Sequence, residues 1–155
     1  MPSHWSELLL LASALTFGLP LAAQQGSEAG VLAIGTASDP AVAVLALYGA
    51  VRTSTRSRLS LSAGAGASAG EAAFRGEILG HFLLSPGKRK GAGFYLAGGV
   101  AAAAGPVDRG YLVLTFGIED RPGAGAGWAV EAGVGGGARL ALGYRWRWLG
   151  SAVPR

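Results

Sequence analysis

The chain of 155 residues has no cysteine, little charge and, after its first 23 residues, no long apolar run. Without cysteine, a disulfide-stapled domain and a Cys-based zinc site are excluded. Charged residues make up only 14% of the chain and hydrophobic residues 50%, which is the opposite of a disordered composition. The longest later apolar stretches, 41–50, 92–104 and 111–118, are shorter than the ~18 residues of a transmembrane helix. Glycine, by contrast, is abundant at 27 residues, and this argues against helical bundles.

The first 23 residues differ from the rest of the chain. Residues 8–23 are apolar apart from four positions, and Ala22 and Ala23 precede two glutamines. An apolar run that ends in small residues is typical of a secretory signal peptide. The run is shorter than the ~20 residues of a spanning helix, and Pro20 interrupts it. We therefore predict a cleaved signal peptide over 1–23, with a retained membrane anchor as the alternative.

The clearest regularity is an alternation of large apolar residues with small or charged ones near the end of the chain. Over 139–148 one set of positions is Leu, Leu, Tyr, Trp and Trp, and the other is Arg, Ala, Gly, Arg and Arg. Alternation with a period of two over ten residues indicates a β-strand with two different faces. The glycines at 135–137 supply the positive φ angles of a tight hairpin to the preceding segment, 128–134.

The same alternation recurs upstream, with turn signals between the segments. The other expected strands lie within 28–36, 41–52, 58–65, 74–84, 94–101 and 111–118. Turn residues separate them at 38–40, 53–56, 68–70, 85–90, 105–108 and 119–125. We therefore predict an all-β fold, an eight-stranded antiparallel up-and-down barrel over 27–149, followed by a short C-terminal tail at 150–155. Both faces of the first two strands are apolar, so their orientation stays open.

The size of such a barrel favours a membrane environment. Eight strands enclose a space just wide enough for side chains. A soluble barrel would have to pack most of the aromatic residues inside and expose glycine, alanine and serine to water. With the bulky residues outside and the small and charged residues inside, the side chains fit the volume of the lumen better. The strand lengths also match the ~9–11 residues of a strand that crosses a bilayer. We therefore predict a transmembrane β-barrel in the outer membrane of a Gram-negative envelope, reached through the signal peptide. A soluble periplasmic barrel that binds an apolar ligand is an alternative.

Aromatic residues support this orientation. If both termini lie in the periplasm, aromatic residues from the last five strands converge on the periplasmic level. Only Phe74 lies near the opposite rim. Convergence at one end is typical of an interfacial aromatic girdle. The predicted girdle consists of Phe82, Phe94, Phe116, Trp128, Trp146 and Trp148.

The end of the last strand resembles the assembly signal of bacterial outer-membrane β-barrel proteins. In that signal a glycine is followed by aromatic residues at alternating positions, here Gly143, Tyr144, Trp146 and Trp148. With the signal peptide and eight amphipathic strands, the pattern over 27–149 is similar to the small outer-membrane barrels of the OmpA/OmpX-like group. The resemblance implies insertion by the barrel-assembly machinery, contact with outer-membrane lipids and a monomer. Two departures are the six residues after Leu149 and the short predicted extracellular turns, which argue against a receptor built on loops.

The predicted lumen contains charged residues of both signs. Seven face inward, namely Arg58, Arg75, Glu77, Glu131, Arg139, Arg145 and Arg147, while Glu119 is expected at the rim. Unpaired buried charge is costly. We therefore expect the two inward glutamates to pair with the arginines as an interior plug, and Glu131 to lie opposite Ala141. An anion-selective passage is the alternative, which the narrow lumen disfavours.

Candidates for chemistry are few. His81 is the one histidine after the predicted signal peptide, and we interpret it as a hydrogen-bonded structural residue. The residues after His81 lack the serine found in outer-membrane lipid A deacylases. No catalytic, cofactor-binding or metal-binding residues are predicted, and the basic run 88–90 is a turn rather than a nucleic-acid site. The predicted function is a non-enzymatic outer-membrane barrel with an envelope-structural or unknown role. A lipid-modifying barrel enzyme with His81 as its base is the alternative.

Overall fold

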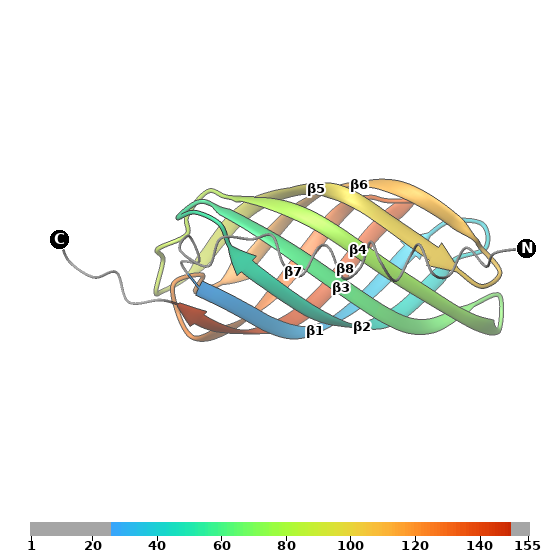
Figure 1. Cartoon of the computed structure of the whole chain (residues 1–155), viewed down its shortest axis with the longest axis horizontal. Coiled ribbons are helices and arrows are strands. Elements are labelled where there is room, and N and C mark those ends of the chain that lie inside the picture. Colours follow the sequence, from blue (N-terminus) through green and yellow to red (C-terminus); the bar gives the residue numbers. More distant parts are fainter. Residues whose placement is uncertain (1–25, 150–155) are drawn as a thin grey trace, which may run out of the picture.

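The computed structural model describes residues 26–149, which form one closed barrel of eight antiparallel strands (Figure 1). The strands are β1 (Gly26–Ala37), β2 (Val42–Arg52), β3 (Ser57–Ser68), β4 (Glu71–Leu83), β5 (Ala92–Ala104), β6 (Arg109–Asp120), β7 (Ala126–Val134) and β8 (Ala138–Leu149). The predicted fold class is confirmed. The predicted signal peptide at 1–23 and tail at 150–155 lie outside the described residues. Within the described part, no helix is long and apolar enough to cross a membrane.

Each strand pairs with its neighbours in the chain, and β8 closes the barrel on β1. This seam runs from Gly26 opposite Leu149 to Ala37 opposite Ala138. The start of β1 and the end of β8 therefore share one end of the barrel, which we call the terminus end. The connections β2–β3, β4–β5 and β6–β7 lie at the same end, and the remaining turns form the far end (Figure 1).

The turns lie within two residues of where the sequence places them, and the largest shift is at the end of β6. Gly136 and Gly137 have φ angles of 82° and 149° in the β7–β8 hairpin, as expected from the glycine run. β6 continues to Asp120, so the turn expected at 119–125 begins only at Arg121. The reason is that Glu119 still pairs with Gly93 of β5, and the ladder extends the strand past the point where the sequence becomes polar.

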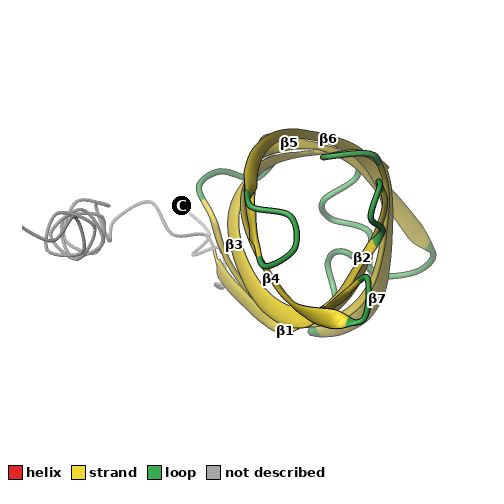
Figure 2. Cartoon of the chain, turned by 90° about the vertical axis from the view of Figure 1, so that its right-hand side faces the viewer, coloured by secondary structure: helices red, strands yellow, loops and turns green. Residues whose placement is uncertain are grey.

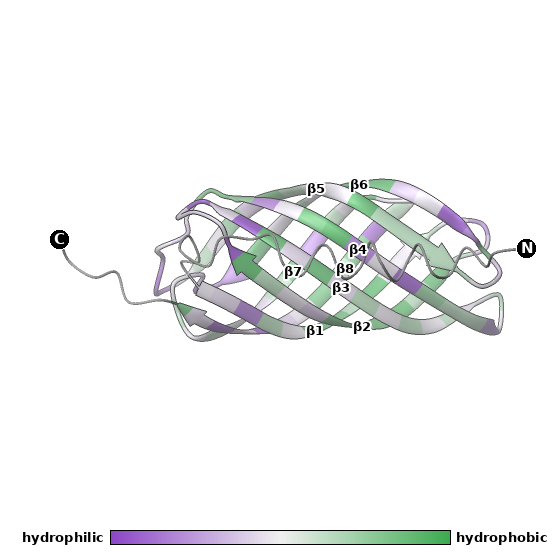
Figure 3. Cartoon of the chain, viewed as in Figure 1, coloured by the Kyte–Doolittle hydropathy of each residue, from purple (hydrophilic) through white to green (hydrophobic). Residues whose placement is uncertain are grey.

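Side chains alternate between the lumen and the outer surface along the strands, and polar residues gather in the connections of the terminus end (Figure 3). This settles the orientation of the first two strands. Glu28 and Ile34 of β1 and Tyr48 of β2 face inward, whereas Leu45 and Leu47 are 66% and 72% exposed. Between the two ends, the outward positions of the described strands carry no charged side chain. The outer face is therefore apolar over its whole middle.

The lumen is filled in two ways. Towards the far end, inward aliphatic residues of β1 and β2 form a cluster that includes Leu32, Ile34, Val42 and Val44, and Val107 of the β5–β6 turn packs against it. This part of the lumen is therefore aliphatic, whereas the predicted arrangement placed small and charged residues inside. In the sequence, both faces of β1 and β2 carry mainly apolar residues. Only closure of the barrel decides which of these residues face the lumen. The rest of the lumen is polar and is described below.

The β6–β7 connection folds across the opening at the terminus end. Pro122 is fully buried there, and Arg52 Nη2 donates to its carbonyl oxygen at 3.0 Å. The backbone amide of Arg147 donates to the carbonyl oxygen of Gly125 at 2.7 Å. Viewed along its length, the molecule is a ring of strands with connections at both mouths (Figure 2). Side chains and connections therefore occupy both ends of the lumen.

Candidate functional site

Charged residues inside the barrel form one connected set, which we call the lumen network. It comprises six arginines and four glutamates, namely Arg52, Arg58, Arg75, Arg139, Arg145, Arg147, Glu28, Glu77, Glu119 and Glu131. All are at most 5% exposed. Strand alternation places them, because each occupies an inward position of its strand. The site is therefore a buried ionic array contributed by all the strands except β5.

At the terminus end, the network joins β1, β2, β3, β6 and β8. Glu28 accepts from Arg52 Nε at 3.2 Å and from Arg58 Nη1 at 2.9 Å. The same Arg58 nitrogen lies 3.1 Å from Glu119 Oε2, which also accepts from Arg147 Nη2 at 3.2 Å. Each carboxylate thus contacts at least two guanidinium groups.

Arg145 connects this half to the other. Its Nη1 lies 3.5 Å from Glu119 Oε2, and its Nη2 lies 2.7 Å from Glu131 Oε1. Glu131 Oε2 accepts from Arg139 Nη1 at 2.9 Å. Arg139 Nη2 then donates to Glu77 Oε2 at 2.8 Å, and Glu77 Oε1 accepts from Arg75 Nε at 2.7 Å. Opposite charges therefore alternate without interruption from one half of the lumen to the other.

The two excess arginine charges of the network have other partners. The Arg145 guanidinium stacks 4.5 Å from the ring centre of Tyr48 and 5.5 Å from that of Tyr95. Arg58 lies 5.1 Å from the same Tyr95 ring. Arg75 Nη2 donates to the carbonyl oxygen of Gly135 at 3.0 Å. Ring faces and carbonyl oxygens both carry negative potential, so they offset positive charge that the carboxylates leave uncompensated.

The structure brings all seven sequence-predicted lumen charges together and adds three that the sequence did not place there. Glu131 pairs with Ala141 as expected. The prediction of Glu119 at the rim is wrong, because it is 1% exposed and pairs inside the barrel. Glu28 and Arg52 were missed because the orientation of their strands was open. The one available signal was their own charge, since a charged residue in an otherwise apolar strand is expected to face the lumen.

His81 lies in the lumen beside the network, at 3% exposure. Its Nε2 is 2.8 Å from Ser60 Oγ and its Nδ1 is 3.3 Å from Arg58 Nη2. A nucleophilic serine needs a base whose other nitrogen faces a carboxylate. Here that nitrogen faces a guanidinium, which disfavours a positive charge on the imidazole. Sequence reasoning missed Ser60, which belongs to the neighbouring strand.

The six residues of the predicted girdle lie on the outer face of β4–β8, with exposures from 41% for Phe94 to 60% for Trp148. Phe94 stacks on Phe116 with ring centres 5.8 Å apart. Tyr144 and Trp146 meet edge-on at 5.3 Å. In the described parts of β1–β3, no aromatic side chain faces outward. The aromatic surface therefore covers five of the eight strands.

The residues of the predicted assembly signal divide between the two faces of β8. Tyr144, Trp146 and Trp148 face outward, and Gly143 faces the lumen. A Cβ atom at Gly143 would collide with the Leu32 side chain across the seam. Gly143 therefore allows β8 to close against β1, while the aromatic residues remain on the surface.

No protein-family model and no curated protein matches the chain. Among solved structures, the chain is similar to the crystal structure of the N-terminal β-barrel domain of OprF from Pseudomonas aeruginosa. The TM-score is 0.62 at 13% sequence identity, and the match covers 81% of this chain and 98% of that one. At this identity the likeness concerns the fold. It confirms that the fold of this chain resembles a small eight-stranded barrel.

Proposed function

We propose that the protein is a non-enzymatic outer-membrane β-barrel protein with an envelope-structural role and a lumen plugged by arginine and glutamate side chains. The lumen network carries the proposal. Its ion pairs leave no carboxylate of the network unpaired, and aliphatic residues fill the lumen towards the far end. A barrel filled in this way has no room for a solute.

The outer surface supports the membrane location. Large apolar side chains such as Leu47, Leu112 and Leu140 are 64–82% exposed. An exposed apolar band of this extent is unfavourable in water and typical of a lipid-facing barrel. The position of the aromatic girdle supports our inference that the terminus end lies at the periplasmic membrane interface.

Membrane fractionation combined with gel migration tests the location. We expect the protein in the outer-membrane fraction, and we expect heated and unheated samples in detergent to migrate differently because the closed barrel resists unfolding. Recovery from the soluble periplasm would overturn the proposal and favour the soluble ligand-binding barrel.

Conductance in a planar bilayer tests the plug. The expected result is no steady current after insertion of the folded barrel, because charged and aliphatic side chains occupy the lumen. A steady anion-selective current would instead support the passage that six buried arginines could line.

The resemblance of β8 to the outer-membrane assembly signal supports insertion by the barrel-assembly machinery, with membrane lipids as neighbours and a monomer as the product. Replacing Trp146 and Trp148 with alanine should reduce the fraction of heat-modifiable protein in the outer membrane. Unchanged insertion would show that these residues are not an assembly signal.

The contact between Ser60 and His81 favours a second candidate function, a lipid-modifying enzyme. Three observations support the non-enzymatic role: both residues are at most 4% exposed, the histidine faces Arg58, and no carboxylate contacts its ring in the described residues. We expect His81→Ala to leave lipid A acylation unchanged in cells. A changed acylation pattern with His81→Ala and Ser60→Ala, but not with a folded lumen variant elsewhere, would favour the enzyme.

A further inference from the structure

Positive charge exceeds negative charge in one half of the lumen network. In the half nearer the far end, two arginines are matched by two glutamates, namely Arg75, Arg139, Glu77 and Glu131. The remaining two glutamates lie among four arginines, namely Glu28 and Glu119 among Arg52, Arg58, Arg145 and Arg147. Arg145 also contacts Glu131, but Arg139 already pairs with that carboxylate. The excess of two positive charges therefore lies nearer the terminus end.

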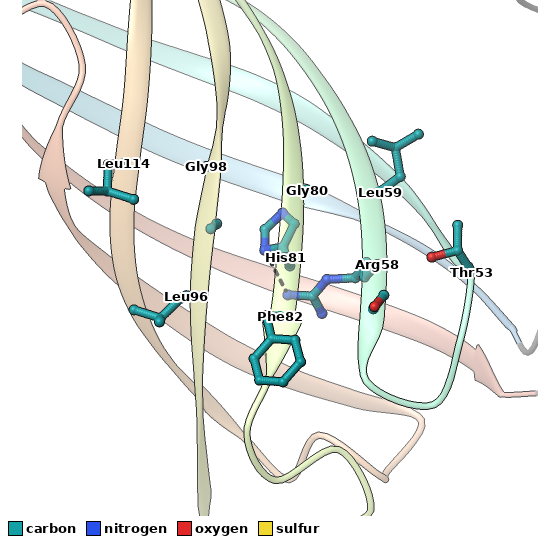
Figure 4. A pocket seen from close by; sticks show the side chains of 11 residues that line it. Thr53, Arg58, Leu59, Gly80, His81, Phe82, Leu96, Gly98 and Leu114 are labelled. Atoms are coloured by element: carbon teal, nitrogen blue, oxygen red, sulfur yellow. Dashed lines mark hydrogen bonds between the residues drawn. The ribbon is translucent and has the colours of Figure 1, made fainter.

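Three of these arginines converge on one oxygen atom. Glu119 Oε2 lies 3.1 Å from Arg58 Nη1, 3.5 Å from Arg145 Nη1 and 3.2 Å from Arg147 Nη2. Arg58 reaches into the lumen beside His81, and its Nη2 lies 3.3 Å from the histidine Nδ1 (Figure 4). One carboxylate carries a single negative charge, so it cannot neutralise three guanidinium groups. Buried like charges at such short separations repel each other strongly, which favours a further anion among them.

The same three arginines carry buried nitrogens that have no acceptor. Arg58 Nε, Arg145 Nε and Arg147 Nε form no hydrogen bond within the described residues, and neither does Arg145 Nη1. In the balanced half, by contrast, all three guanidinium nitrogens of Arg75 and of Arg139 donate hydrogen bonds. A guanidinium N–H can only donate, and a buried donor without an acceptor costs free energy. Unsatisfied donors therefore occur where the positive charge is in excess.

We propose that a halide ion, chloride in saline, binds in the lumen among Arg58, Arg145 and Arg147. The ion accepts from the N–H groups that lack another acceptor and neutralises one of the two excess charges. The ring faces of Tyr48 and Tyr95 lower the cost of the excess charge, but they carry no net charge. A water molecule would satisfy the donors and leave the charge in place, and buried charge is costly unless it is paired.

The inference rests on the plugged lumen of the proposed function and adds a resident ion to it. A halide is close to a water molecule in size, so it fits between side chains where a larger solute does not pass. The three arginines come from β3 and β8. The ion therefore joins an early strand to the last one, besides completing the charge balance of the network.

Anomalous X-ray diffraction from crystals grown in sodium bromide locates the ion directly, because bromide replaces chloride and scatters anomalously. The expected result is a bromide ion in contact with the Arg145 guanidinium and with that of Arg58 or Arg147. Bromide on the outer surface only, or water alone beside these groups, would overturn the proposal.

Unfolding in urea gives an independent measurement. The barrel is held in neutral lipid vesicles, and sodium chloride replaces sodium gluconate at constant ionic strength. An anion that binds the folded barrel and not the unfolded chain shifts the equilibrium towards the folded state. We expect the folding equilibrium constant to rise about tenfold on this exchange, the shift of an anion at roughly ten times its Kd. An unchanged constant would overturn the proposal.

A variant of the site and a matched control separate a bound ion from a general effect of salt. Arg147→Met removes one donor and one excess charge, and Glu119 keeps two arginine partners. Arg75→Met removes an arginine from the balanced half and leaves Glu77 paired with Arg139. The chloride effect should be lost in the first variant and retained in the second. Equal chloride effects in the two variants would overturn the site. If Arg147→Met does not fold, the bromide position in the unaltered protein decides.

Conductance in a planar bilayer separates this inference from the proposed plug. Bound bromide in a barrel that carries no current supports both. A barrel that carries no current and binds no bromide contradicts only the halide site. A steady anion current would overturn both, because anions would then pass through the lumen instead of remaining bound.

Discussion

Glu131 accepts hydrogen bonds from three side chains in the lumen. Its carboxylate accepts from Tyr95 Oη at 2.7 Å, Arg139 Nη1 at 2.9 Å and Arg145 Nη2 at 2.7 Å. Both arginines are fully buried, so neither can turn to water if the carboxylate is lost. A buried pair adds little net stability compared with a well-packed apolar core, but removing one partner leaves an uncompensated charge.

Glu131→Gln should therefore destabilise the barrel by about 3–5 kcal/mol. The measurement is the free energy of unfolding in urea, in lipid vesicles, followed by tryptophan fluorescence. Asp120→Asn is the control, because its pair with Arg121 is partly exposed and such pairs contribute ~1 kcal/mol or less. Similar losses in the two variants would contradict the assigned importance of the network.

Gly117 makes room for the aromatic ring that supports this network. It pairs with Tyr95 across β5 and β6, and a Cβ atom would fall within the space of the tyrosine ring. Tyr95 is completely buried, so the ring cannot move outward. Gly117→Ala should cost about 1–3 kcal/mol, the usual cost of overpacking.

The control for this prediction is Gly49→Ala. Nothing lies within 4 Å of its added Cβ, so the unfolding free energy should change by about 0.5 kcal/mol or less. A neutral Gly117→Ala variant in the same urea titration would show that the Tyr95 ring is free to shift.

The sequence predicted most of these residues because position in an alternating strand determines whether a side chain faces inward. It could not predict partners, since these depend on the stagger between strands. Ser60 and His81 are 21 residues apart in the chain but 2.8 Å apart in space. Arg52 bonds to Pro122 across 70 residues, which no local pattern encodes.

At the scale of elements, the β6–β7 connection is more than a turn. Arg121 N donates to the Gly91 carbonyl oxygen at 3.0 Å, and Gly123 N donates to that of Lys88 at 2.8 Å. These bonds join the connection to the β4–β5 connection, while Pro122 enters the lumen. The sequence predicted only a turn here, because glycine and proline indicate a reversal without showing the direction in which the loop folds.

Arg52 should hold this cap in place. Arg52→Met keeps an aliphatic stem but removes the bond to the Pro122 carbonyl oxygen, so we expect faster amide hydrogen exchange over 121–125. Hydrogen–deuterium exchange read by mass spectrometry measures it. The far-end turn at 105–108 serves as the internal reference, because Arg52 does not contact it. Acceleration at both ends would indicate general destabilisation, and none at either would contradict the role of Arg52.

At the scale of the molecule, the barrel is asymmetric along its axis. The terminus end carries the longer connections, the aromatic girdle and the basic residues Arg56, Lys88, Arg89, Lys90 and Arg121, while the far end has short turns with mainly acidic residues. Alternation predicted the closed, lipid-facing barrel. It could not predict the aliphatic filling towards the far end, because which apolar face of β1 and β2 turns inward is decided only when β8 pairs with β1.

This asymmetry allows the orientation in the membrane to be measured directly. The chain has no cysteine, so a single introduced thiol reports its own location. Glu71→Cys lies in β4 next to its far-end turn, and Arg89→Cys lies in the exposed β4–β5 connection at the terminus end. With both termini in the periplasm, a maleimide too large to cross the outer membrane should label position 71 in intact cells. It should label position 89 only after the membrane is permeabilised. The reverse pattern would place the girdle and the basic run 88–90 at the cell surface. Labelling of both positions in intact cells would contradict a barrel that spans the membrane, because only a spanning barrel separates its two ends by a barrier.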